Sequence, residues 1–206
     1  MNMFKKFAVA TFFCAVTVVN AEDGMKIGVR AGYSMQSVAY GRGMLGLRGG
    51  VDADIPIIGP VFISPELAFL YRNNWSSTRE IGGKAVDWTQ PEFAVSIPIM
   101  IKFFLGLSST IAIGAEVDIP INAKECLDNE CNSADGKKPP YYNIERADFD
   151  VGIVLSFGYI ITESLALDFR YVYGLTPHHK YVNNYIPGFK SDPLSSYGFG
   201  ITYFFL

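Results

Sequence analysis

Acidic and basic side chains at alternate positions are the residues of this sequence best placed to do chemistry. Two adjacent carboxylates could act as a general acid and base. Carboxylates interleaved with arginines are more typical of charges buried as ion pairs, because an unpaired buried charge is costly. We therefore predict a structural charge network, with Asp54 on the same polar face. Its members are Arg30, Arg48, Asp52, Glu66, Arg72, Glu92, Glu116, Asp118, Asp150, Asp168 and Arg170.

The sequence has two histidines, His178 and His179, which are adjacent. A histidine that activates a serine is the chemistry of acyl transfer and hydrolysis, and a lipid A acylase or deacylase would place such a pair at a membrane surface. No serine can be positioned beside His178 from the sequence, so this enzyme is an alternative. The stretch 41–46 fits G-x-G-x-x-G, but a strand pattern follows it where a dinucleotide site needs a helix. We expect no catalytic residue, no metal and no cofactor.

Cys126 and Cys131 lie in the longest polar segment, and Cys14 lies in the first 21 residues. No further cysteine or histidine stands at metal-ligand spacing from this pair. In an exported protein, two cysteines so close in sequence are expected to form a disulfide.

The segments that must position these residues alternate between apolar and polar side chains, which is the pattern of a β-strand with two different faces. Each segment is about ten residues long, enough to cross a bilayer at a tilt. The eight predicted strands are 26–36, 45–55, 63–72, 88–103, 111–119, 149–159, 165–173 and 196–205.

Composition limits the class of protein. Of the 206 residues, 50% are hydrophobic, 15% are aromatic and 18% are charged, which excludes intrinsic disorder. The formal charge of −3 argues against a nucleic-acid partner. Lys5 and Lys6 precede an uncharged apolar run and a small-residue site that ends at Ala21. We predict a secretory signal peptide over residues 1–21 and one domain over residues 22–206.

The connections between the predicted strands alternate in length. Segments 55–61, 103–110 and 160–164 are short, whereas 73–87, 120–146 and 174–195 are long and polar. Short turns on one side and long loops on the other are typical of outer-membrane barrels. Aromatic residues gather near both strand ends, as interfacial girdles require: Tyr33, Tyr71, Trp75, Trp88, Phe149 and Tyr173 at the long loops, and Phe62, Phe103, Tyr159, Tyr203 and Phe205 at the short turns.

These patterns predict an all-β fold: an eight-stranded antiparallel up-and-down transmembrane β-barrel preceded by a signal peptide. A barrel of this size holds only its own side chains, so we expect no open pore. Pro98 lies within a strand and donates no hydrogen bond, so a bulge or distortion is expected there. A soluble periplasmic β-barrel that binds an apolar ligand would also alternate and is kept as an alternative.

Three segments resemble the outer membrane protein β-barrel domain family, which includes PorT-like proteins. Residues 93–103 (FAVSIPIMIKF) are similar to its "leIPlllKy" strand, residues 165–176 (LALDFRYVYGLT) to its penultimate strand "lelRYsyGLt", and residues 198–205 (GFGITYFF) to its last strand. These barrels usually end on an aromatic residue, whereas this chain adds Leu206. The resemblance implies an OmpX-like eight-stranded barrel and no single shared activity.

The function we expect is that of a non-enzymatic integral barrel in the outer membrane of a Gram-negative bacterium, acting in envelope structure or surface binding. Its expected partners are outer-membrane lipid, the barrel-assembly machinery during insertion, and an unidentified surface or periplasmic protein.

Overall fold

A computed structural model of the chain describes residues 24–38, 42–74, 77–81, 84–89, 91–106, 108–127, 130–133, 144–146, 148–176, 179–181, 193 and 195–205. The predicted signal peptide, residues 1–21, lies outside the described residues.

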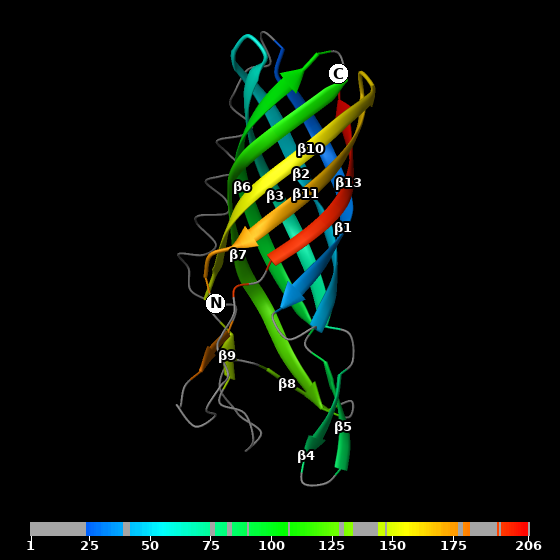
Figure 1. Cartoon of the computed structure of the whole chain (residues 1–206), viewed down its shortest axis with the longest axis vertical. Coiled ribbons are helices and arrows are strands. Elements are labelled where there is room, and N and C mark those ends of the chain that lie inside the picture. Colours follow the sequence, from blue (N-terminus) through cyan, green and yellow to red (C-terminus); the bar gives the residue numbers. More distant parts are fainter. Residues whose placement is uncertain are drawn as a thin grey trace.

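Eight long antiparallel strands form a closed barrel, which confirms the predicted fold (Figure 1). They are β1 (Lys26–Val38), β2 (Arg42–Ile58), β3 (Val61–Asn74), β6 (Glu92–Leu105), β7 (Ser109–Leu127), β10 (Asp150–Thr162), β11 (Leu165–Gly174) and β13 (Ser195–Phe205). Their order around the wall is β10-β11-β13-β1-β2-β3-β6-β7, and the pairing of β10 with β7 closes the ring.

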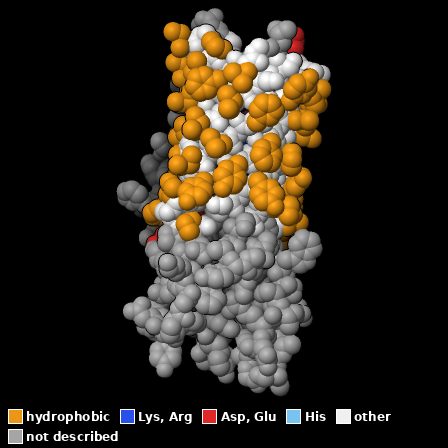
Figure 2. All heavy atoms as spheres, in the orientation of Figure 1, with side chains coloured by type: hydrophobic (Ala, Val, Ile, Leu, Met, Phe, Trp, Pro, Cys, Tyr) orange, Lys and Arg blue, Asp and Glu red, His pale blue; other side chains and the backbone are white. Residues whose placement is uncertain are grey.

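The two faces of the wall follow the alternation in the sequence. In β11, Leu167, Phe169 and Tyr171 point outward and are 41%, 39% and 37% exposed, whereas the intervening Arg170 is 4% exposed. Apolar side chains cover the outside of the barrel in the view of Figure 2. The wall is therefore apolar outside and carries its charges inside, the reverse of a water-soluble barrel.

Short turns join the strands at one end. Gly59 and Gly106 have φ values of 52° and 76°, the left-handed region that these tight turns use and that glycine adopts without strain. The first and last barrel strands begin and end at the same side, because Ile27 pairs with Phe205.

The long segments at the other end contain β-structure that the sequence did not predict. They include β4 (Ser77–Ile81), β5 (Lys84–Thr89), β8 (Glu130–Ser133), β9 (Ile144–Arg146) and β12 (His179–Tyr181). The predicted strand 88–103 began too early, because residues 88 and 89 belong to β5 and the barrel strand β6 begins at Glu92. Strand β7 also continues eight residues beyond its predicted end at Ile119, to Leu127. Strands β4, β5, β7 and β8 pair side by side beyond the barrel (Figure 1).

The hydrogen-bonded ladder between β3 and β6 is interrupted opposite Pro98. The last pair before the gap is Pro65 with Ile99, and the first pair after it is Ala68 with Ser96. The register is the same on both sides of the gap. The distortion expected at Pro98 is thus a gap in the ladder. The bulge on this strand lies elsewhere, between Phe93 and Ala94 on the β7 side.

Candidate functional site in the barrel lumen

A central cluster of ion pairs is built around Glu66 on β3, whose side chain is fully buried. Its carboxylate accepts hydrogen bonds from Arg170 Nη2 at 2.6 Å and Arg48 Nε at 2.7 Å, with Arg30 Nη1 at 3.4 Å. Glu116 Oε2 in turn lies 2.9 Å from Arg48 Nη2 and 3.7 Å from Arg170 Nη1. We call these residues the Glu66 cluster.

Asp168 of β11 extends this cluster through a hydrogen bond from Arg30 on β1. The two side chains meet across β13 because the intervening residue is Gly200. A Cβ atom at Gly200 would lie 2.8 Å from Asp168 Oδ1 and 3.0 Å from Arg30 Nε. Glycine on the inner face therefore makes room for the charged pair.

Arg72 forms a second cluster nearer the long loops. Its Nη2 donates a hydrogen bond to Asp118 Oδ2 at 2.6 Å and lies 3.7 Å from Glu92, and its Nη1 lies 3.7 Å from Asp150. These partners come from β7, β6 and β10, so one arginine on β3 joins four strands.

Lys102 and Asp54 form a third pair, nearer the short turns, that sequence reasoning missed. Lys102 Nζ donates to Asp54 Oδ1 at 2.5 Å, and Ser64 donates to the same oxygen. The alternation in the sequence indicates this position. Lys102 is an even-numbered residue of the same strand as Glu92 and Ser96, so its side chain lies on the same inward face. Asp52 is buried beside this pair, and a Cβ atom at Gly28 would lie 2.8 Å from its Oδ1.

All eleven residues of the predicted charge network therefore lie on the inner face, and ten of them form ion pairs centred on Arg30, Arg48, Arg72 and Arg170. The exception is Asp52, which lies on this face outside those pairs.

Aromatic rings narrow the lumen at the short-turn end. Phe204 is 7% exposed, and the Nζ atoms of Lys26 and Lys102 lie 5.9 and 6.0 Å from its ring centroid. Phe62 packs on Phe104 with ring centroids 4.7 Å apart. Phe62 pairs with Lys102 across the ladder and shares its inward face, so its expected place in the outer aromatic girdle is wrong.

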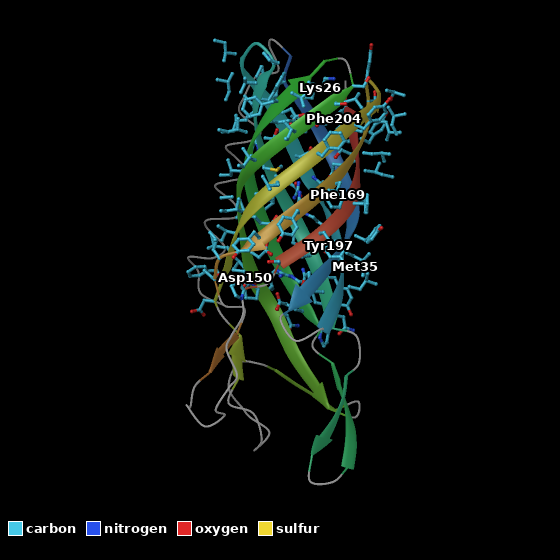
Figure 3. The ribbon with its side chains drawn as sticks, viewed as in Figure 1. Lys26, Met35, Asp150, Phe169, Tyr197 and Phe204 are labelled. Atoms are coloured by element: carbon cyan, nitrogen blue, oxygen red, sulfur yellow. The ribbon has the colours of Figure 1, made fainter. Side chains whose placement is uncertain are left out.

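At the long-loop end the lumen contains a hollow that is open to solvent. Its polar lining includes Gln36, Arg72, Asp150 and Ser196. Figure 3 shows Asp150 near this end and Phe204 near the opposite one. Residues of both charged clusters, such as Arg48, Arg72 and Arg170, line this hollow, and the aromatic rings close the opposite end.

The chemistry of this interior is charge compensation. Within the described part of the chain, no three histidine, cysteine, aspartate or glutamate side chains are grouped so that they could hold a metal ion. His178 lies outside the described residues, and the side chains of Cys126 and Cys131 are likewise not described. The described residues also include no helix that is long and apolar enough to cross a membrane.

Comparison with known proteins finds similarity only among solved structures. No family model matches the chain, and no curated protein matches it. The crystal structure of Neisserial surface protein A covers 88% of this chain and 97% of its own, with 13% sequence identity and a TM-score of 0.47. The attachment invasion locus protein of Yersinia pestis, solved with a heparin analogue, covers 88% and 97% with 12% identity and a TM-score of 0.46. A designed transmembrane β-barrel covers 87% and 95% with 9% identity and a TM-score of 0.46.

Proposed function

We propose that the chain is a non-enzymatic integral β-barrel of the outer membrane of a Gram-negative bacterium, which acts in envelope structure or surface binding through the β-structure beyond its rim. The observation that carries this proposal is the apolar outer face of a closed barrel whose inner face is charged and paired.

The outer face is too apolar for water. Large side chains such as Leu47, Phe69, Phe157, Phe199 and Ile201 are each more than half exposed. The largest apolar patch on a typical soluble monomer is about 300–600 Å², whereas these residues stand on four different strands around the wall. A lipid environment removes this cost, and a closed barrel leaves no backbone edge unsatisfied in lipid.

The orientation of the faces also disfavours a soluble barrel that binds an apolar ligand. Such a barrel needs an apolar interior, and here the interior holds the Glu66 cluster and Arg72 with its three acidic partners. His178, the base of the lipid-modifying alternative, lies outside the described residues.

Three classes of partner follow from this proposal. Outer-membrane lipid would contact the apolar face, the barrel-assembly machinery would insert the chain, and a surface or periplasmic protein would bind the exposed end. The closed ring of strands and its apolar outer face support lipid and the barrel-assembly machinery as partners. The sheet of β4, β5, β7 and β8 beyond the rim offers a surface for a protein partner.

Cell fractionation tests the proposal. The protein is expected in the outer-membrane fraction, to resist extraction by alkaline carbonate, and to require detergent for solubility. Its folded form should migrate differently from boiled protein on SDS gels. Recovery of the folded protein from the soluble periplasm without detergent would refute the membrane location.

A further inference from the structure

Strand β7 extends well beyond the barrel wall. Its pairing with β10 ends at Asp118 and its pairing with β6 ends at Ala123. Beyond Ala123 it pairs with β5 on one side and with β8 on the other. The end of β7 and the whole of β8 therefore belong to a small sheet at the long-loop end (Figure 1).

The register of this sheet places two cysteines opposite each other. Cys126 of β7 pairs directly with Cys131 of β8, and the next pair outward is Leu127 with Glu130. A one-residue slip would place each cysteine opposite a different residue and on the other face from its partner. The pairing of the two cysteines is thus specific to the observed register.

The position of the pair within the hairpin suits a disulfide. Antiparallel pairs alternate between hydrogen-bonded and non-hydrogen-bonded, and the pair that flanks a two-residue connection is hydrogen-bonded. Leu127 and Glu130 flank two residues, so Cys126 and Cys131 form a non-hydrogen-bonded pair. The Cα atoms of such pairs lie about 4.5 Å apart with their side chains close, within the range of about 4.4–6.8 Å that disulfides span.

We propose that Cys126 and Cys131 form a cross-strand disulfide that fixes β8 to the end of β7. The proposal rests on the proposed function, because thiols persist in the cytosol and disulfides form in oxidising compartments outside it.

The oxidant is a protein or small-molecule disulfide. A thiolate of one cysteine attacks the oxidant's disulfide, which forms a mixed disulfide and releases one thiol of the oxidant. The second cysteine's thiolate then attacks the sulfur of the first, which forms the Sγ–Sγ bond and releases the oxidant's second thiol. The hairpin loses two protons and two electrons, and the oxidant is reduced to a dithiol.

The disulfide would stabilise the hairpin of β7 and β8 and not the barrel wall. The barrel pairings of β7 end at Ala123, three residues before Cys126, so the barrel closes without the disulfide. Within the described residues, β8 pairs with β7 alone. Fixing β8 in its register presents a pre-ordered edge of the sheet to a partner and reduces the entropy lost when that partner binds.

Peptide mapping under non-reducing conditions tests the proposal. Protein extracted from membranes is denatured with an alkylating reagent present and digested with trypsin, which leaves both cysteines in the single peptide 125–137. This peptide is expected without alkylation and lighter by two hydrogen atoms than its reduced form. Reduction should also remove the hydrogen-exchange protection of the β8 amides and leave that of β1 and β13 unchanged.

Designed pairs test the register behind the proposal. Both native cysteines are replaced by serine, and a new pair is introduced as Lys124→Cys with Ser133→Cys, or as Glu125→Cys with Asn132→Cys. The first pair is in register on the same face and non-hydrogen-bonded, so it should oxidise readily. The second is a hydrogen-bonded pair and should oxidise more slowly. Equal rates, or a faster second pair, would overturn the assigned register.

A parallel oxidation in vitro separates this proposal from the proposed function. Protein refolded in detergent is treated with oxidised glutathione and mapped in the same way. Two alkylated thiols both in cell-derived and in glutathione-treated protein would overturn the pairing. Free thiols in cells together with closure in vitro would support the pairing and contradict the location outside the cytosol.

Discussion

Replacing Glu66 with glutamine is expected to destabilise the barrel by about 3–5 kcal/mol, the cost of breaking one buried ion pair. Glutamine keeps the shape of the side chain but removes its charge and turns one acceptor oxygen into a donor. Three arginines face that carboxylate. Arg30 retains Asp168 and Arg48 retains Glu116 at 2.9 Å. The remaining arginine, Arg170, keeps only Glu116, whose Oε2 lies 3.7 Å from its Nη1. The loss of unfolding free energy should therefore be close to that of one broken ion pair and not three.

A double-mutant cycle checks this assignment. Arg170→Met removes the arginine that Glu66→Gln leaves poorly paired, so the two changes together should cost less than the sum of the single changes, by about 1–3 kcal/mol. Glu163→Gln is the matched control, because Glu163 is exposed in a short turn and its change should stay within about 0.5 kcal/mol of wild type.

The measurement is urea unfolding in detergent micelles or lipid vesicles, with the folded fraction read from unboiled SDS gels. A midpoint for Glu66→Gln equal to that of the Glu163→Gln control would show that this carboxylate is solvated and that the Glu66 cluster does not hold the barrel together. Additive single and double variants would refute the direct pairing with Arg170.

Three further predictions concern the lumen and the wall. Because Phe204 and the charged clusters fill the lumen, purified protein in planar bilayers should give no stable porin-like current, and reproducible large single-channel steps would refute the filled interior. Leu167→Arg on the lipid face should cost about 2–4 kcal/mol in vesicles, against almost nothing for Glu163→Arg, and equal unfolding midpoints would contradict the membrane orientation. Gly200→Ala should destabilise by about 1–3 kcal/mol in urea unfolding because its Cβ meets two charged side chains. Gly49→Ala meets only one atom, at 4.0 Å, and should be tolerated; the opposite order would be inconsistent with the packing around Gly200.

The strands of the barrel wall could be predicted from the sequence because their two faces meet different surroundings, which imposes a two-residue alternation of apolar and polar side chains. A strand with an apolar outer face and a polar, packed inner face must alternate at every residue, and the outward positions of segments such as 165–173 and 196–205 are apolar or aromatic without exception. The same alternation predicts that the side chains of Asp168 and Arg170, which lie between the outward residues of this strand, point inward. The same alternation places Lys102 on the inner face, although the predicted charge network contained only arginines and acidic residues.

The partners within the lumen could not be predicted in this way. Glu66 and Arg170 are 104 positions apart in sequence, and their meeting depends on the order, tilt and stagger of strands around the ring. Strands β4, β8, β9 and β12 were not predicted and β5 was not separated from the strand that follows it, since three to six residues are too few to show a period.

The gap in the ladder at Pro98 has a mechanical consequence. Between Pro65 and Ala68 strand β3 lacks main-chain pairing to β6, so the tube has a seam in its wall at the level of Glu66. The Glu66 carboxylate reaches across the full diameter to Arg170, because β11 stands four places from β3 in the eight-stranded ring. In a bilayer, where we propose that the barrel lies, this ion pair connects opposite sides of the wall and opposes flattening of the barrel at the height where the ladder is interrupted.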